Sequence, residues 1–238
     1  MRRRRGSAFS RFKDKARAFV ERQKNPAAPI KNLRAINDHI QKYFGEKFFV
    51  LHGKKSAVVH IDVNVVLPSA TRPYYTLLTS GMSDRTMRVP RGVAGSSLAE
   101  LCLCLPKEWP ISQEDMKWAT PEYFWPIAAL KEIARYPHLR QTWVSLGHTF
   151  GSIEHPEPLD PESRFVGLIL LRPLTFPKGA EQATAEDGRE IQYLAIIPLM
   201  RGELAFKLDA DADALSKRLM AAGVTEVLNP GRQSVVSD

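Results

Sequence analysis

The chain has 238 residues, of which 44% are hydrophobic and 25% are charged, a balance that argues against a disordered chain and fits a globular protein. Its two cysteines, Cys102 and Cys104, stand too close together for a disulfide framework, so we expect a reducing, cytoplasmic environment. No apolar run is long enough to span a bilayer, and the basic N-terminus lacks the apolar stretch of a secretory signal.

The net charge of +8 is concentrated at the N-terminus. Residues 1–24 hold ten of the 34 Lys and Arg residues but only two of the 26 Asp and Glu residues, which accounts for the whole excess. The rest of the chain is therefore neutral, which argues against nucleic-acid binding by the main fold.

Residues 1–29 are predicted to form a basic amphipathic arm followed by a linker. Apolar residues recur at helical spacing and basic residues fall on the opposite face, in the order Phe9, Arg11, Phe12, Lys15, Ala16, Phe19, Val20 and Arg22, before Pro26 and Pro29 end the pattern. Such a helix could bind an anionic membrane surface, nucleic acid or an acidic partner. We favour the alternative in which the phenylalanine stripe docks on the main domain and the basic face stays in solvent.

The first half of the main domain predicts one helix followed by strands. Residues 30–44 carry an apolar face at helical spacing, and strands are predicted over residues 47–51, 57–67, 74–80 and 99–105. Alternation within residues 57–67 places Val59, Ile61, Val63 and Val65 on one face and His60, Asp62 and Asn64 on the other.

The second half predicts a helix that begins near Pro126 and stops at Pro137. Strands follow over residues 141–150, 164–171 and 191–197, then a last helix over residues 208–219 and a short strand over residues 224–228. Asp209 or Asp211 is the expected N-cap of that helix, and Gly223 follows its end. Runs of strands with widely spaced helices favour an α+β fold: a single compact domain, residues 30–238, with a mixed, largely antiparallel sheet and flanking helices.

The common catalytic motifs are missing from the sequence: it has no dinucleotide-binding glycine pattern, P-loop, zinc-protease helix or serine-hydrolase elbow. His60 and Asp62 could begin a metal site, as could the Cys102 and Cys104 pair, but neither pair has further ligands nearby in the sequence. We therefore predict no catalytic residue, no metal and no cofactor, and we expect the cysteines to be buried thiols.

Several short segments follow one another in a recognisable order: residues 60–63 (HIDV), 72–84 with TSGMSD at its end, 99–106, 125–136 beginning with WPI, 147–149 (GHT), 158–160 (PLD), 163–165 (SRF) and 194–199 with Glu203. Together they resemble the suppressor of fused family. The resemblance implies a compact α+β domain that binds another protein. Animal members sequester a transcription-factor peptide as a strand added between two lobes, and this chain resembles only their N-terminal lobe. Stand-alone bacterial domains of this kind are suspected immunity proteins against toxins.

Residues that match the family pattern and are polar or aromatic at strand ends are our candidates for partner contact: Asp62, Tyr75, Ser80, Met82, Asp84, Glu100, His148 and Arg164. A buried ion pair of Arg164 with an acidic residue is the structural alternative for some of them. A second hypothesis is an enzyme, which would require several of His60, Asp62, Glu100 and His148 to converge in one cleft. A third is association with nucleic acid or an anionic membrane through residues 1–24.

Overall fold

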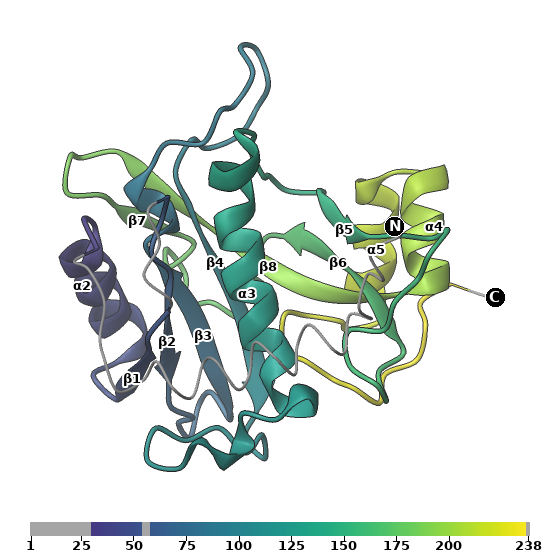
Figure 1. Ribbon diagram of the computed structural model, residues 1–238, viewed down its shortest axis with the longest axis horizontal. Helices are drawn as coiled ribbons and strands as arrows, with labels where there is room; N and C mark the ends of the chain where they lie inside the picture. The colour runs from purple at the N-terminus through teal and green to yellow at the C-terminus, as the bar shows by residue number, and fades with distance from the viewer. Residues whose placement is uncertain (1–29, 54–57, 237–238) are drawn as a thin grey trace, which may run out of the picture.

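The computed structural model describes residues 30–53 and 58–236, and its strands form one eight-stranded sheet (Figure 1). The strand order is β1-β2-β3-β4-β8-β6-β5, and β7 pairs with β8 off this path. The strands are β1 (Phe48–Leu51), β2 (Asp62–Val66), β3 (Tyr74–Ser80), β4 (Ala99–Pro106), β5 (Thr149–Gly151), β6 (Phe165–Leu171), β7 (Gln182–Thr184) and β8 (Glu190–Met200). The helices are α2 (Leu33–Phe44), α3 (Pro121–Arg140), α4 (Arg201–Asp209) and α5 (Ala212–Ala221).

Neighbouring strands run antiparallel except for β4 and β8, which are parallel in the middle of the sheet. The predicted α+β class, with a mixed and mostly antiparallel sheet in a single compact domain, is confirmed. None of the described helices is both long and apolar enough to cross a membrane.

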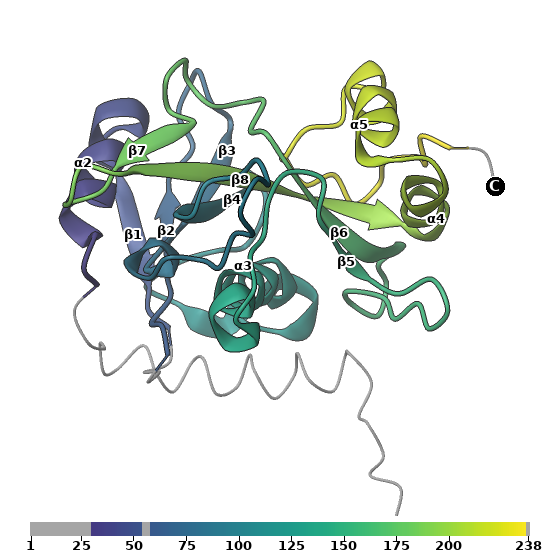
Figure 2. The same cartoon turned by 90° about the horizontal axis from the view of Figure 1, so that it is seen from above.

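Helices cover both faces of the sheet (Figure 2). Helix α3 lies on one face, above a core of residues from β2, β3, β4 and β8. On the other face α2 covers one end of the sheet, and α4 with α5 covers the other end. Alternation along β8 shows this division: Leu194 and Ile196 face α3, Tyr193 faces the α2 end, and Ile197 and Leu199 face α4 and α5.

Strand β2 is shorter than predicted. Only Asp62–Val66 pairs with its neighbours, although residues 57–67 were expected to form one strand. The predicted face is nevertheless confirmed, because Val59, Ile61, Val63 and Val65 all contribute to the core beneath α3. The chain before β2 approaches Gly53 so closely that a Cβ at position 53 would lie 1.9 Å from the Ile61 carbonyl oxygen. Residues 59–61 are therefore buried without forming a ladder, and Ile61 lies against Gly53.

Helix α3 is longer than predicted, and both of the prolines expected to bound it lie inside it. Pro121 occupies the first turn instead, and Gln141 ends the helix in the left-handed region with φ 54°. Each internal proline removes a backbone hydrogen bond, which costs up to about 3 kcal/mol in an exposed helix. Pro126 and Pro137 are both buried, and this packing offsets the cost.

The C-terminal region contains two helices where the pattern predicted one. Strand β8 leads directly into α4, and α5 follows after a sharp break. Asp211 is the N-cap of α5, since its carboxylate accepts the Ala214 N–H at 2.7 Å, and Gly223 follows α5 at φ +69°, as predicted. The strand predicted over residues 224–228 is wrong: a single bridge joins Val227 to Cys104. The strand predicted over residues 141–150 shrinks to β5, because a turn follows α3.

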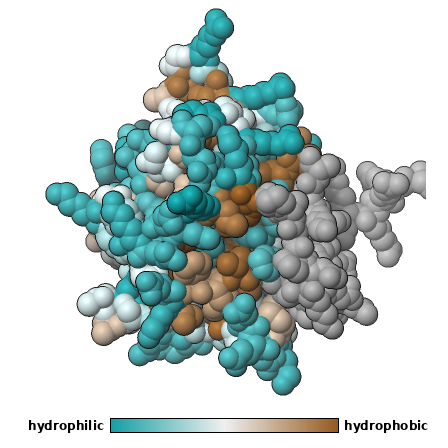
Figure 3. Space-filling view, turned by 90° about the vertical axis from the view of Figure 1, so that its left-hand side faces the viewer, coloured by the Kyte–Doolittle hydropathy of each residue, from teal (hydrophilic) through white to brown (hydrophobic). Residues whose placement is uncertain are grey.

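The sheet ends in β1 on one side and in β5 on the other. Figure 3 looks onto the side that carries β1, where apolar side chains gather at the surface. The first three residues of β1 are half-buried and the last is buried.

Candidate functional site

Five of the eight predicted contact residues gather at one end of β2, β3 and β4. Asp62 stands opposite Ser80 in the β2–β3 register, and Gly81 turns the chain with φ +104° into a short 3₁₀ helix, Met82–Asp84. Glu100, the second residue of β4, lies beneath this turn. These five predicted residues are therefore neighbours in the fold.

Glu100 organises the turn from below. Its carboxylate accepts the N–H groups of Gly81 and Ser83, at 3.0 and 2.9 Å, and the hydroxyls of Ser83 and Thr79, at 2.7 and 2.6 Å. The side chain is completely buried. Burial raises the pKa of Glu100 to about 7, although the four hydrogen bonds favour the charged form.

Asp62 has the opposite electrostatic character. Burial favours its neutral form, but hydrogen bonds from His60 at 2.8 Å and from the Gly53 N–H at 2.6 Å outweigh burial and lower the pKa of Asp62 to about 2. His52 adds a third contact at 3.1 Å. This carboxylate is therefore charged at neutral pH and holds His52 and Gly53, just after β1, against the start of β2.

The 3₁₀ turn also joins the two helical layers. The Asp84 carboxylate accepts the N–H groups of Lys31 and Asn32, just before α2, and the Met82 carbonyl is 2.9 Å from Nε2 of His138 on α3. Asp62, Ser80, Met82 and Glu100 are buried and Asp84 is half-buried. A partner therefore cannot reach four of these five side chains in this conformation. Glu100 holds the turn in place, whereas Asp62 holds the chain that follows β1.

The other three predicted residues lie elsewhere. Tyr75 is half-buried near the opposite end of β3, opposite Leu105. Arg164 is exposed just before β6, so the buried ion pair considered for it is wrong. His148 directly precedes β5, which is five strands from Asp62, or about 24 Å at the usual strand spacing. His148 is therefore remote from His60, Asp62 and Glu100, which are buried near one end of β2, β3 and β4.

His148 adjoins the open edge of the sheet at β5. Its carbonyl accepts the Leu170 N–H at 3.0 Å, which fixes the phase of the β5–β6 ladder. Since alternate residues of an antiparallel strand point toward and away from the partner strand, Thr149 and Gly151 direct their backbone groups to the open side. Burial, and then the charge of Lys207, lower the pKa of His148, so its ring is neutral at pH 7.

Exposed apolar side chains lie near the end of α3 and just after β5. Tyr136 and Leu139 on α3 are 40% and 58% exposed, and Ile153, two residues after β5, is 36% exposed. Tyr136 meets Phe150 of β5 edge-to-face, with ring centroids 5.3 Å apart. Sequence reasoning missed Leu139 because α3 was expected to end at Pro137. It missed Ile153 because attention in that loop went to the charged residues.

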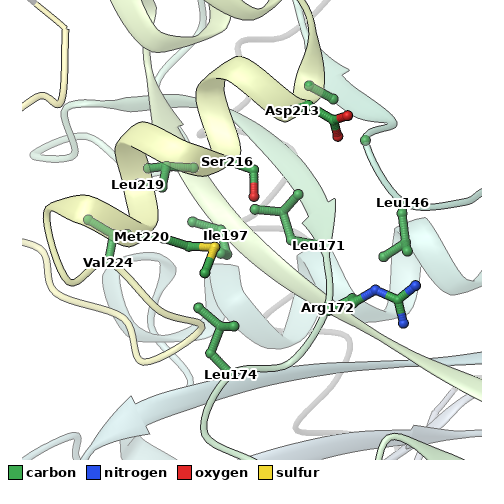
Figure 4. A pocket seen from close by; sticks show the side chains of 12 residues that line it. Leu146, Leu171, Arg172, Leu174, Ile197, Asp213, Ser216, Leu219, Met220 and Val224 are labelled. Atoms are coloured by element: carbon green, nitrogen blue, oxygen red, sulfur yellow. The ribbon is translucent and has the colours of Figure 1, made fainter.

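An apolar groove opens beside the start of β5 (Figure 4). It encloses about 290 Å³ between α5 and the chain around Leu171, and Leu146 and Gly147, which lead into β5, form part of its wall. In Figure 4 the Ser216 hydroxyl points into the space, with Arg172 and Asp213 at its margins. We define the β5 surface as the open edge of β5, the side chains of Tyr136, Leu139 and Ile153, and this groove.

The β5 surface offers backbone hydrogen bonds and apolar contacts, which suit a peptide segment. It provides no evident metal centre: within residues 30–53 and 58–236, no three or more His, Cys, Asp or Glu side chains are placed to hold an ion. The two cysteines are buried free thiols, as expected.

Comparisons with known proteins agree with this architecture. The fold is similar to a suppressor of fused homologue from Neisseria gonorrhoeae (17% identity, TM-score 0.60, 87% of this chain and 98% of that one). It is also similar to a chain of the Sufu–Fu complex (18% identity, TM-score 0.61, 87% and 93%) and to Drosophila Suppressor of Fused (18% identity, TM-score 0.59, 87% and 52%). No curated protein sequence matches the chain. The family model for Suppressor of fused protein (SUFU) matches residues 57–233, and the chain therefore belongs to the suppressor of fused family.

Proposed function

We propose that this protein binds a partner protein by accepting a segment of it as an additional strand along β5. The observation that carries the proposal is the open β5 edge, which Tyr136 reaches through Phe150, with Leu139 exposed one turn further along α3 and Ile153 exposed just after β5. A family member has been crystallised in a Sufu–Fu complex, which supports protein binding as the shared activity.

Two kinds of contact would contribute to binding. Backbone pairing with Thr149 and Gly151 sets the direction and register of the added strand, at a net gain of about 1 kcal/mol for each hydrogen bond. The apolar side chains supply most of the affinity, because burying an exposed Leu or Tyr is worth about 1.5–3 kcal/mol. An apolar side chain of the partner would enter the groove beside Leu146.

The five residues around the 3₁₀ turn have a different part in this proposal. Asp84 binds the start of α2 and the Met82 carbonyl contacts His138 of α3, and α3 in turn presents Tyr136 and Leu139. His148, also a predicted contact residue, lies next to the edge itself and offers a neutral ring. Tyr75 and Arg164 lie outside the β5 surface as we define it, so we assign them no contact.

Binding of this kind would sequester the partner segment. A toxin held inactive is the partner class that the resemblance to stand-alone family domains suggests. Co-expression of such a toxin with the protein tests this directly: growth is restored if the pair forms and is not restored by a variant with a blocked β5 edge.

The binding experiment compares three variants as baits for partners in the native lysate. Thr149→Pro removes an outward N–H that the β5–β6 ladder does not use. Leu139→Ser removes an exposed apolar contact, and Leu208→Ser, on α4 and 54% exposed, is its matched control. We expect wild type and Leu208→Ser to retain the same partner, and the other two variants to bind it at least about tenfold more weakly, a difference of about 1.4 kcal/mol. Equal retention by all variants with native-like melting temperatures would contradict the β5 surface.

A further inference from the structure

The opposite end of the sheet also has an open edge, and it is more apolar. The Leu67 N–H donates to the Lys47 carbonyl at 3.0 Å, which fixes the phase of the ladder, so Val50 directs its N–H and C=O away from β2. In the described part of the chain no strand pairs with that side of β1. A hydrophobic strand edge of this kind invites unwanted pairing unless something covers it.

The side chains of β1 contribute to both faces of this edge. Phe48 packs against the core under α2, Phe49 packs against the core under α3, and both remain half-buried together with Val50. No charged residue interrupts the strand from Phe48 to Leu51. The resulting patch, Phe48, Phe49 and Val50, belongs to the side of the molecule seen in Figure 3, on which apolar side chains gather. We call it the β1 patch.

The described chain begins beside the same end of the sheet. The Ile30 side chain is buried and lies against Gly81, and Gly81 packs on the His60 carbonyl. Asp62 accepts the Gly53 N–H, and Gly53 lies two residues beyond the end of β1. The 29 residues before Ile30 therefore join the domain close to the β1 patch.

We propose that residues 1–29 cover the β1 patch, with the phenylalanine stripe of the predicted amphipathic helix packed on Phe48, Phe49 and Val50. The dimensions agree. A helix over residues 9–24 would be about 24 Å long, whereas the four residues of β1 span about 13 Å. Residues 25–29, between this helix and Ile30, can extend about 17 Å, which is enough for the helix to turn back along the β1 edge.

The sequence of the segment suits this position. Phe9, Phe12 and Phe19 would lie on the patch, and Arg11 and Lys15 would face solvent. This arrangement assigns the basic residues a protective role, because an exposed cationic face discourages another chain from pairing along this edge. It is independent of the proposed β5 surface, which lies at the other end of the sheet.

Amide hydrogen exchange of Val50 in the full chain tests the proposal. The double variant Phe12→Asp with Phe19→Asp should expose the edge and speed Val50 exchange by about tenfold or more. The control variant Arg11→Asp with Lys15→Asp introduces the same two carboxylates on the opposite face while removing two cations, and it should leave Val50 exchange within about twofold of wild type. Amides of α5 serve as an internal control, and they should exchange equally in all three proteins.

Three results would overturn the proposal. Equal Val50 exchange in wild type and in the phenylalanine variant would show that the segment does not cover β1. Protection of Val50 that grows with protein concentration in every variant would assign the edge to a second copy of the chain. Val50 exchange that is fast in wild type, together with binding of residues 1–29 to vesicles of phosphatidylserine and phosphatidylcholine, would assign the stripe to a membrane surface.

Discussion

Replacing Glu100 is the sharpest test of the buried 3₁₀ turn. In Glu100→Ala the N–H groups of Gly81 and Ser83 lose their acceptor in a site without solvent, and two hydroxyls lose theirs. An orphaned buried N–H costs about 1–3 kcal/mol, and hydroxyls can turn to other acceptors, so we expect a loss of about 4 kcal/mol. This is a large part of the roughly 5–15 kcal/mol that stabilises a domain.

The isosteric Glu100→Gln variant should lose much less of the free energy of unfolding, about 1–2 kcal/mol. Its oxygen can take the place of the carboxylate oxygen that accepts from Gly81 and Ser83. Its amide would face Thr79, whose hydroxyl already accepts the Leu101 N–H at 2.7 Å and can turn its own proton to the Leu101 carbonyl, 3.4 Å away. Urea unfolding of both variants, monitored by circular dichroism, measures the difference.

The pH dependence of Glu100 gives a second readout of the same site. With a folded-state pKa of about 7 against an ordinary value of 4.5, the native protein retains a proton that the unfolded chain has released between these pH values. The contribution of Glu100 to stability therefore declines as pH rises from 4.5 to about 7, and Glu100→Gln should remove that slope. A loss below about 1 kcal/mol in Glu100→Ala, or an unchanged slope in Glu100→Gln, would refute the reasoning.

Three further perturbations test other parts of the fold. The pKa of Asp62 is lowered from 3.8 to about 2, so Asp62 should contribute about 2 kcal/mol to the free energy of unfolding, and this contribution disappears as pH falls through this range. In urea titrations, Asp62→Asn should lack that acid-dependent loss of stability. Arg232→Met should leave the Glu203 carboxylate buried without its 2.5 Å partner and cost about 3–5 kcal/mol, whereas Arg164→Met, at an exposed position, should leave the melting temperature unchanged. Asp211→Ala should cost about 1 kcal/mol by removing the α5 cap, and an unaltered denaturation midpoint would contradict that role.

Periodicity predicted the fold class because it reports which side chains face a core. The face shared by Val59, Ile61, Val63 and Val65 was correct even though only part of that segment forms a ladder, since burial does not require pairing. The predicted ends of α3 were wrong because burial by distant residues overrode the local pattern. Local preferences place prolines at helix boundaries, but the packing that keeps Pro126 and Pro137 within α3 comes from residues far away in the sequence.

The candidate site was predictable only in part. The family pattern led to residues such as Glu100 and Ser80, and the structure shows that they share one end of three strands. Their polarity suggested exposure, but their hydrogen bonds are internal. The β5 surface escaped prediction because an open edge is defined by strand order, and neither Thr149 nor Leu139 carries a sequence signal of its position.

The parallel pairing at the centre of the sheet has a consequence for how the chain acquires its structure. Strand β4 lies between β3, which is nearby in sequence, and β8, in which Gln192 pairs with Ala99. The first four strands can associate early during synthesis, but β4 has no inner neighbour until β8 has emerged. Such long sequence separations slow folding, because the entropy of closing the loop is lost before the contacts form. An incompletely synthesised chain therefore exposes an unpaired strand edge along β4, in addition to that of β1, and this edge can pair with other chains. In the completed protein β8 occupies it.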